Sequence, residues 1–375
     1  MADAASTPGI RPRAAVLRMK EYHPPLGNRD GLRLDFNENT LECSPEVLRV
    51  LRGTGSADLT KYPEREPAER LVAQHLGLDA DQLLLTNGVD EAIHVLCQTY
   101  LDAGDEMLLP VPTYSMYEVY SSATEARIVT VRTDEDFRFP HERLLRAVTP
   151  ATKLIAIANP NSPTGSVATR EQILQIVESA PHAVVLVDEA YFHFYGKTVA
   201  DLLGRYPNLL LARTFSKAYG LAGLRLGALA GPADAIRWLR RVISPYSVNS
   251  LALACLPAAL RDRAYLDWYV GEVLAARAEF VSALHSLSVY SWPSEANFVL
   301  ARIGPRHAAF TAAMRRRGVL VRDRSSDPGC AGCVRITVGT RPQTAAGVAA
   351  LIESLDEIGW SEHEPMHEPA EEKPA

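Results

Sequence analysis

The chain of 375 residues has little of what marks membrane, secreted or nucleic-acid-binding proteins. Its longest apolar candidate, residues 251–260, is far shorter than the roughly 18 residues of a membrane span and contains Pro257. Residues 1–20 hold no apolar segment of the kind found in signal peptides. The formal net charge is −6, whereas a nucleic-acid partner favours a basic patch. We therefore expect a cytoplasmic protein that has neither a membrane nor a nucleic acid as partner.

Cysteine is scarce as well. The five cysteines are an odd number without a secretory signal, which favours reduced thiols over a disulfide framework. Cys330 and Cys333 form a Cys-x-x-Cys pair, the spacing of redox switches and of half a zinc site. No second pair accompanies it, and the pair precedes an expected strand instead of opening a helix. We therefore expect ordinary loop cysteines and no metal site.

The sequence does contain a series of short apolar runs that favour a sheet. Hydrophobic residues make up 47% of the chain, enough for one large domain and a smaller one. Several runs are continuously apolar, as in buried parallel strands, and helical patterns separate most of them, which is typical of an α/β fold. The runs are 82–86, 106–109, 154–158, 183–187, 209–212 and 227–230. In such a sheet, ligands bind beyond the carboxyl ends of the strands.

Lys217 follows the fifth run and lies among small and hydroxyl residues. A lysine at the end of a buried strand is costly unless it is paired or used covalently. Its amine can form a Schiff base with a carbonyl, and pyridoxal phosphate is the common carbonyl cofactor. Ser216 and Arg225 lie nearby in the sequence and suit a phosphate. The simpler alternative is a solvated or ion-paired lysine, so the other strand ends must decide.

Three other strand ends carry groups that suit the same cofactor. Gly88 and Asp90 begin an amphipathic stretch after the first run, where free backbone N–H groups suit a phosphate. Tyr114 follows the second run and offers a ring that can stack on a flat cofactor. Asp188 follows the fourth run and can pair with a protonated pyridine nitrogen. Each has a simpler reading, as a turn, a core ring or a helix cap. Together they supply an amine, an acid, a stacking ring and a phosphate site.

These strand ends resemble those of the fold-type-I pyridoxal-phosphate aminotransferases, and more closely those of the histidinol-phosphate aminotransferase family. The resemblance runs from about residue 22 to about residue 359. It implies an α/β fold with a large domain, in which helices sandwich a mostly parallel sheet, and a smaller α+β domain. The matching segments are 35–39, 61–64, 87–91, 112–117, 159–165, 188–191, 214–227 and 335–340.

The resemblance also implies a role for each residue around the cofactor. Lys217 would hold the cofactor as a Schiff base and later carry the proton between the substrate α-carbon and the cofactor C4′. Asp188 would bind the pyridinium nitrogen and Tyr191 the phenolate oxygen, while Tyr114 would stack on the ring. The other cofactor-binding residues implied are Gly88, Val89, Asp90, Thr214, Ser216 and Arg225 at the phosphate, Asn161 and Ser162 beside the ring, and Tyr62 from the partner subunit of a homodimer.

For the substrate, the resemblance implies that Arg335 grips the anionic end, since a guanidinium fork suits a carboxylate or a phosphate. Tyr22 and Arg322 match further ligands of the substrate phosphate. Two positions depart from the family's pattern. Ser162 stands where a second asparagine is usual, and its hydroxyl is shorter. Thr40 stands where proline is frequent, in a loop near the substrate.

The segments predict a division of the chain into a large and a small domain with two terminal extensions. Residues 46–250 form the large cofactor-binding domain, and residues 21–45 and 251–360 form the small domain. A long helix over 266–287 and strands over 297–300 and 334–338 belong to the small domain. Residues 1–20 are expected to be a flexible arm. Residues 361–375, with five glutamates and one lysine, are expected to be a disordered acidic tail.

The implied reaction moves an amino group from L-histidinol phosphate to 2-oxoglutarate, giving imidazole acetol phosphate and L-glutamate in histidine biosynthesis. An aromatic amino-acid aminotransferase is an alternative that has little need of Tyr22 and Arg322. A threonine-phosphate-type decarboxylase is another; it keeps the cofactor residues but releases carbon dioxide. A third alternative is a non-catalytic protein of this fold, against which the joint presence of Lys217, Asp188 and Arg225 argues.

Overall fold

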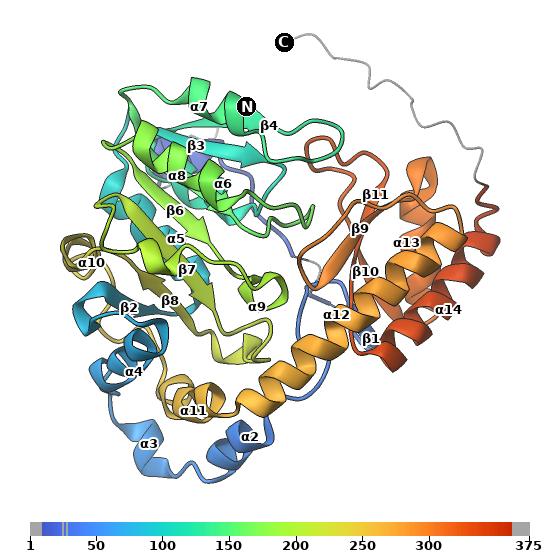
Figure 1. Ribbon diagram of the computed structural model, residues 1–375, viewed down its shortest axis with the longest axis horizontal. Helices are drawn as coiled ribbons and strands as arrows, with labels where there is room; N and C mark the ends of the chain where they lie inside the picture. Colours follow the sequence, from blue (N-terminus) through green and yellow to red (C-terminus); the bar gives the residue numbers. More distant parts are fainter. Residues whose placement is uncertain (1–9, 25, 28, 362–375) are drawn as a thin grey trace, which may run out of the picture.

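The computed structural model describes residues 10–24, 26–27 and 29–361, which form two sheets flanked by helices (Figure 1). The larger sheet has seven strands in the order β2-β8-β7-β6-β5-β3-β4. Its neighbouring strands are parallel except at β8, so the predicted mostly parallel sheet is confirmed. The strands are β2 (Leu83–Thr86), β3 (Glu106–Val111), β4 (Arg127–Arg132), β5 (Thr152–Ala158), β6 (Val184–Asp188), β7 (Leu209–Thr214) and β8 (Gly227–Ala230).

Two strands of the large sheet differ from the sequence prediction. The run 227–230 was expected to be parallel, but β8 runs antiparallel to both β2 and β7. The loop between β7 and β8 contains only the short 3₁₀ helix η3 (Ala222–Leu224), and a parallel return requires a longer crossover. The sequence analysis missed β4, because Val131 is the only buried residue of this edge strand and its apolar pattern is weak.

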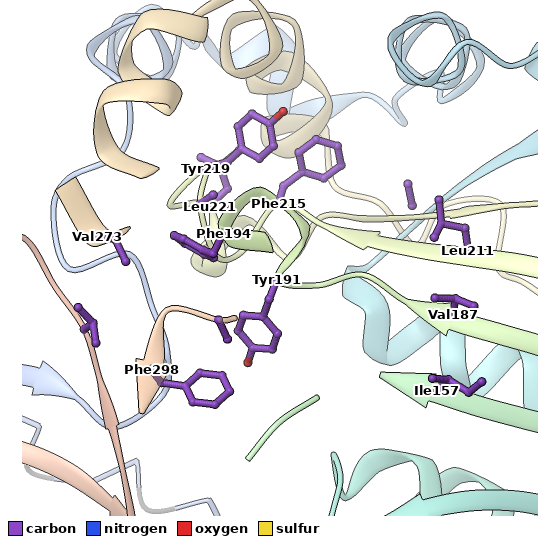
Figure 2. Packing of buried hydrophobic residues seen from close by; sticks show 14 of the residues in the cluster. Ile157, Val187, Tyr191, Phe194, Leu211, Phe215, Tyr219, Leu221, Val273 and Phe298 are labelled. Carbon is purple, nitrogen blue, oxygen red and sulfur yellow. The ribbon is translucent and has the colours of Figure 1, made fainter. Parts of the chain in front are cut away.

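The large sheet is buried on both faces, which explains its continuously apolar strands. Successive residues point to opposite faces, so Val185 and Val187 enter one hydrophobic cluster while Leu186 enters another. Figure 2 shows Ile157, Val187 and Leu211 at matching positions on three neighbouring strands. This core holds the carboxyl ends of the strands rigidly at one edge of the sheet.

The smaller sheet combines the two ends of the chain. Its order is β1 (Leu32–Leu34), β10 (Val319–Asp323), β11 (Cys333–Thr337) and β9 (Phe298–Arg302). β1 pairs in parallel with β10, so the segment that follows β1 lies against the C-terminal half of the chain. Within this half, the predicted long helix is present as α12 (Arg263–Ser286), which Figure 1 shows passing from beside α11 toward the smaller sheet.

The remaining helices cover the two sheets. They are α1 (Ala14–Arg18), α2 (Pro45–Arg52), α3 (Ser56–Thr60), α4 (Glu66–Leu76), α5 (Gly88–Tyr100), α6 (Met116–Ser122), α7 (His141–Ala147), α8 (Arg170–Ser179), α9 (Phe192–Tyr195), α10 (Ala233–Leu239), α11 (Ser250–Arg261), α13 (His307–Arg316) and α14 (Arg341–Glu357). Within the described ranges, no helix combines the length and the apolar character of a membrane span.

Some predictions about the chain ends fall outside the described residues. These are the first part of the predicted arm, 1–9, and nearly all of the predicted tail, 362–375. The rest of the arm is not irregular throughout, because α1 forms within it and buries Ala15. The boundaries of the two domains stay a prediction.

Cys330 and Cys333 are fully buried beside Phe137 and Trp292.

Candidate active site

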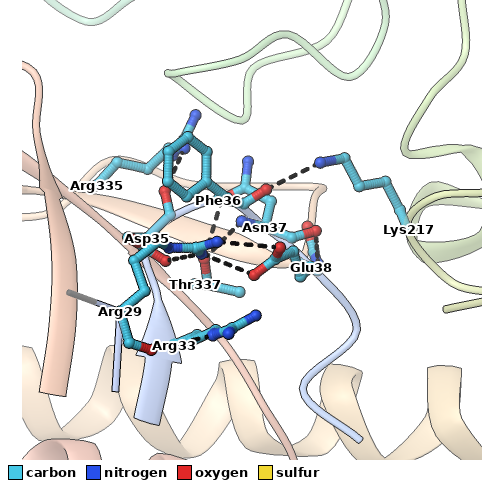
Figure 3. A network of polar contacts seen from close by, with 10 residues as sticks. Arg29, Arg33, Asp35, Phe36, Asn37, Glu38, Lys217, Arg335 and Thr337 are labelled. Carbon is cyan, nitrogen blue, oxygen red and sulfur yellow. Dashed lines mark hydrogen bonds and ion pairs between the residues drawn. The ribbon is translucent and has the colours of Figure 1, made fainter. Parts of the chain in front are cut away.

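Lys217 lies just beyond β7, in the loop that leads to β8. Thr214 ends the strand, and its hydroxyl accepts a hydrogen bond of 3.1 Å from the Ser216 backbone N–H as the chain leaves the sheet. The Lys217 amine donates to the carbonyl oxygen of Phe36 at 2.9 Å, as Figure 3 shows. The amine is therefore presented in the space between the large sheet and the segment that follows β1.

Asp188 ends β6 and is 5% exposed. Its carboxylate accepts hydrogen bonds from the Tyr117 hydroxyl at 2.7 Å and from the Ala190 backbone N–H at 3.0 Å. Burial raises the pKa of Asp188 to about 6, although these two hydrogen bonds and Lys217 favour the ionised form. No cationic side chain forms an ion pair with Asp188 among the described residues. A buried acid of this kind suits a cationic ring nitrogen of a ligand.

Tyr191 follows Asp188 and faces the same space. Its hydroxyl accepts a hydrogen bond of 2.8 Å from the Asn37 side-chain amide, and its ring meets Phe298 edge-on at 5.2 Å. Figure 2 shows the Tyr191 hydroxyl pointing away from the large sheet, toward Phe298 of the smaller one. Lys217 lies close by, with its nitrogen 5.9 Å from the Tyr191 ring centroid.

The first turn of α5 forms a site that suits a phosphate. Gly88 has φ 77°, and a Cβ there would lie 2.6 Å from Nη2 of Arg225. The backbone N–H groups of a first helical turn have no partner within the helix, and the helix dipole favours an anion there. Arg225 adds a cation at this end of the helix. Val89 and Asp90 continue the turn, with Val89 packed against the core.

The Asp90 carboxylate is occupied by neighbouring side chains. It accepts hydrogen bonds from the Tyr114 hydroxyl at 2.7 Å and from Arg225 at 2.8 Å. Burial, reinforced by Asp90, raises the pKa of Tyr114, so its hydroxyl stays protonated and keeps donating. Asp90 therefore positions the Tyr114 ring and the Arg225 guanidinium, and its carboxylate is not free for a ligand.

Asn161 and Ser162 lie in the loop after β5, and their side chains have different partners. The Asn161 amide donates to the Thr164 hydroxyl of its own loop at 2.8 Å and to the carbonyl of Pro112, just after β3, at 2.9 Å. The Ser162 hydroxyl accepts a hydrogen bond of 2.9 Å from Arg335. Asn161 thus ties the loop after β5 to the loop after β3, whereas Ser162 connects it to β11.

Arg335 is 7% exposed and has no carboxylate in direct contact among the described residues. Besides Ser162, it donates to the Asp35 carbonyl oxygen at 2.7 Å, and its Nε has no hydrogen-bond partner. Burial lowers the pKa of Arg335 to about 10, which still leaves the guanidinium charged at neutral pH. A buried guanidinium with an unpaired N–H can bind an anionic ligand.

Of the other predicted substrate residues, Arg322 lies next to Arg335. Arg322 stands directly opposite it across the β10–β11 pair, with the guanidinium carbon 5.3 Å from the Phe36 ring centroid. Arg29 holds the Asp35 carboxylate at 2.7 Å, as Figure 3 shows. Tyr22 is 41% exposed and lines an open cavity of about 520 Å³ beside α6.

Tyr62 is 78% exposed, and its ring packs against Tyr246 with the centroids 4.4 Å apart. The single chain thus leaves this side chain on its surface.

The structure brings the two sheets together through the predicted residues. Lys217 reaches the segment after β1, Tyr191 binds Asn37 of that segment, and Arg335 of β11 binds Ser162 in the loop after β5. Four groups therefore face one space between the sheets: the Lys217 amine, the buried Asp188 carboxyl, the N-terminus of α5 with Arg225, and the Arg335 guanidinium. This donor set fits pyridoxal phosphate, because an unpaired buried acid and a phosphate site flank a lysine.

Residues 29–351 match the family model of class I and II aminotransferases. The chain belongs to this family. The fold and the transaminase activity predicted from the sequence are thereby confirmed, and members of the family use pyridoxal phosphate. The aminotransferase is 35% identical to the histidinol-phosphate aminotransferase of Caldanaerobacter subterraneus subsp. tengcongensis over 329 residues, which cover 86% of this chain and 93% of that protein.

Solved structures agree on the fold of the aminotransferase. Histidinol-phosphate aminotransferase from Sinorhizobium meliloti, in complex with pyridoxal-5′-phosphate, has a TM-score of 0.84 at 24% identity, over 93% of this chain and 98% of that chain. L-threonine-O-3-phosphate decarboxylase from Porphyromonas gingivalis has a TM-score of 0.77 at 24% identity, over 87% and 99% of the two chains. The fold alone therefore does not separate these two activities.

The sequence analysis did not assign two polar residues of this site. Tyr117 lies three positions after Tyr114, and its hydroxyl is the side-chain partner of Asp188. Asn37 lies within a motif that the family resemblance identified, but its contact with Tyr191 depends on how the two sheets meet. Tyr114 precedes α6 and Tyr117 lies in its first turn, so the spacing of the two tyrosines does not by itself predict that both rings reach one site.

Proposed function

We propose that the aminotransferase transfers the amino group of L-histidinol phosphate to 2-oxoglutarate, giving imidazole acetol phosphate and L-glutamate. The observation that carries this proposal is the cationic end of the site. Arg335 and Arg322 face one another there without an ion-paired carboxylate among the described residues. A relative that is 35% identical over most of both chains bears the same activity in its name.

Pyridoxal phosphate, when bound, supplies an electron sink for the bonds at the substrate α-carbon. We assign its phosphate to the first turn of α5 with Thr214, Ser216 and Arg225. Asp188 would hold the pyridine nitrogen, and its ionised form becomes favourable once a cation is next to it. The Tyr191 hydroxyl would bind the phenolate oxygen.

Lys217 has two tasks in this proposal. Its uncharged amine would hold the cofactor covalently. As a free base, the Lys217 amine would also move the proton at the substrate α-carbon. Its position beyond β7 and its reach to the Phe36 carbonyl support this assignment, because the amine already projects into the space between the two sheets.

The substrate's anionic end would lie at Arg335 and Arg322, with Tyr22 at the edge of the same region. One site can serve both half-reactions, because the phosphate of the donor and the distal carboxylate of the acceptor are both anions. Phenylalanine and tyrosine carry no anion at this end. The buried Nε–H of Arg335, which has no hydrogen-bond partner, therefore favours the phosphorylated donor over the aromatic alternative.

A homodimer is part of this proposal, with Tyr62 reaching the cofactor phosphate of the partner subunit. A large exposed aromatic pair, Tyr62 and Tyr246, supports an interface at this surface. Tyr62→Phe should weaken cofactor binding without changing the oligomeric state, which sedimentation and a cofactor titration would measure together. Full activity in a monomer would refute the role of Tyr62. A cytoplasmic location remains a proposal as well.

The deciding experiment follows the visible absorption of the purified protein with its cofactor. Addition of L-histidinol phosphate without a keto acid should remove the absorption band of the lysine-bound cofactor, and 2-oxoglutarate should restore it. A band that responds only to phenylalanine would establish the aromatic alternative. Release of carbon dioxide instead of formation of L-glutamate would establish a decarboxylase. Lys217→Ala should abolish the band and the turnover, and a variant as active as the wild type would refute the assignment of Lys217.

A further inference from the structure

Three arginines lie on one face of the β10–β11 hairpin. Arg322 and Arg335 are directly opposite each other, and opposite residues of an antiparallel pair share a face. Arg324 lies two residues beyond Arg322, and its backbone N–H continues the ladder to β11 with a bond of 2.9 Å. Alternation along the strand therefore places it on the same face. Asp323 points the other way, where its carboxylate lies 2.8 Å from His307.

Only one of these arginines has a carboxylate partner among the described residues. Arg324 forms an ion pair with Asp327, three positions later in the sequence. The nearby Asp35 carboxylate is held by Arg29, with contacts of 2.7 and 3.1 Å. Asp327 is therefore the one carboxylate that this hairpin directs at its own arginine cluster.

The loop after β10 is built to return Asp327 to this position. The Asp327 backbone N–H donates to the Arg324 carbonyl at 2.9 Å, and the following turn continues from the Asp327 carbonyl to Cys330 at 2.9 Å. The Asp327 side chain is 20% exposed, and its Oδ2 is the atom that contacts Arg324. Burial raises the pKa of Asp327, while Arg324, Arg335 and Arg322 all act against this rise, so its charge is within electrostatic reach of the whole cluster.

Three guanidinium charges and one carboxylate charge leave two positive charges on this cluster. We propose that Asp327 is a specificity-determining residue, an internal counter-ion that sets the charge of the substrate's anion site. This inference rests on the proposed function, which places the anionic end of the substrate at Arg322 and Arg335. Two positive charges match a phosphate dianion and exceed the single charge of a carboxylate.

Asp327 weakens the binding of every anion, and of a dianion most. The Coulomb energy between a ligand and a fixed charge is proportional to the ligand's charge, so the repulsion from Asp327 doubles for a dianion. The site must bind and release a phosphate in one half-reaction and a carboxylate in the other. Asp327 lowers the affinity for the donor phosphate more than the affinity for the acceptor carboxylate. The two affinities are therefore closer to each other, and neither ligand blocks the site for the other.

The test uses the enzyme loaded with pyridoxal phosphate, so that inorganic phosphate cannot enter the cofactor's own phosphate site. Calorimetric titration with inorganic phosphate at about pH 8 should give about tenfold tighter binding to Asp327→Asn than to the wild type. Glutarate, which presents a single carboxylate at this end, should gain about threefold. Asp323→Asn is the matched control and should leave both affinities unchanged, because its carboxylate points away from the cluster.

A second variant separates charge from damage to the loop. Arg324→Gln removes a positive charge but leaves Asp327 facing the other two arginines, so phosphate should bind about tenfold more weakly. A loop that had lost its structure would weaken binding in both variants. Opposite shifts for Asp327→Asn and Arg324→Gln are therefore expected. Shifts in the same direction, or unchanged phosphate binding in Asp327→Asn, would overturn the role of Asp327.

The titration does not depend on turnover, so it separates this inference from the proposed function. An enzyme that shows the opposite shifts but does not transaminate L-histidinol phosphate would refute the proposed substrate and leave the role of Asp327 intact. A wild-type enzyme that transaminates L-histidinol phosphate but does not bind millimolar inorganic phosphate would overturn the inference alone.

Discussion

Asp188→Asn should stabilise the cofactor-free protein above pH 6 while weakening its hold on pyridoxal phosphate. Burial moves the pKa of Asp188 from 3.8 to about 6, and no cation pairs with it among the described side chains. A carboxyl whose pKa is raised by folding opposes folding once it ionises. Its favourable contribution is complete below pH 3.8 and is lost as the pH rises through about 6.

The magnitude follows from this shift. A rise of about two pKa units costs about 3 kcal/mol of unfolding free energy at pH 8. Asparagine stays neutral, but its single side-chain oxygen can accept only one of the hydrogen bonds from Tyr117 and Ala190. Its buried amide N–H groups also need acceptors of their own. Their desolvation offsets about 1–2 kcal/mol of the gain. A net stabilisation of about 1–2 kcal/mol at pH 8 is therefore expected, with no advantage at pH 5.

Denaturant unfolding of the cofactor-free protein at the two pH values measures this difference. Asp201→Asn is the control with the opposite sign, because Arg170 lowers the pKa of the exposed Asp201 carboxyl. That variant should lose a little stability at pH 8. Cofactor affinity of Asp188→Asn should fall on the order of thirtyfold or more, as expected for a lost charged hydrogen bond. An Asp188→Asn protein that is equally stable to the wild type at pH 8, or stabilised equally at both pH values, would refute the reasoning.

Further predictions concern the phosphate site and the anion site. Gly88→Ala places a Cβ 2.6 Å from an Arg225 nitrogen at a positive φ, so cofactor affinity should drop at least tenfold in a fluorescence titration; an unchanged affinity would contradict the close approach. Ser162→Ala removes a hydrogen-bond partner of Arg335, so KM for both substrates should rise about tenfold with a smaller change in kcat, and an effect on kcat alone would contradict this. Tyr114→Phe keeps the stacking ring but loses its hydroxyl contact, so steady-state kinetics should show a loss of less than tenfold in kcat/KM; a larger loss would show that the hydroxyl does more than position the ring.

Much of the large sheet could be predicted from the sequence, because its central strands are buried on both faces and carry their polar residues at or near their ends. The direction of β8 could not, since an apolar run carries no sign of its orientation. Between β7 and β8 lies only the 3₁₀ helix Ala222–Leu224, which is too short for the crossover that a parallel strand requires. This short connection decides the antiparallel direction of β8.

For the candidate site as well, some features could be predicted from the sequence and others could not. Lys217, Asp188 and Gly88 follow strands, so their convergence could be predicted from the topology of a parallel sheet. The partners of Asp90 could not, because a carboxylate beside a phosphate site looks like a ligand until Tyr114 and Arg225 are placed around it. Contacts between the two sheets depend on how the sheets pack against each other, which local sequence does not encode.

The contacts of β1 and the segment after it with β10 and β11 have a consequence for how the enzyme is made. The Asn37 backbone N–H binds the Thr337 hydroxyl at 3.0 Å across 300 residues of sequence. At about 5–20 residues per second, the ribosome needs on the order of 15–60 s to produce that partner after Asn37. The strands of the large sheet, which end at residue 230, have all been synthesised by then. The early segment that accepts the Lys217 hydrogen bond must wait for the last part of the chain, so a product truncated before β10 carries Lys217 without its neighbours from the smaller sheet.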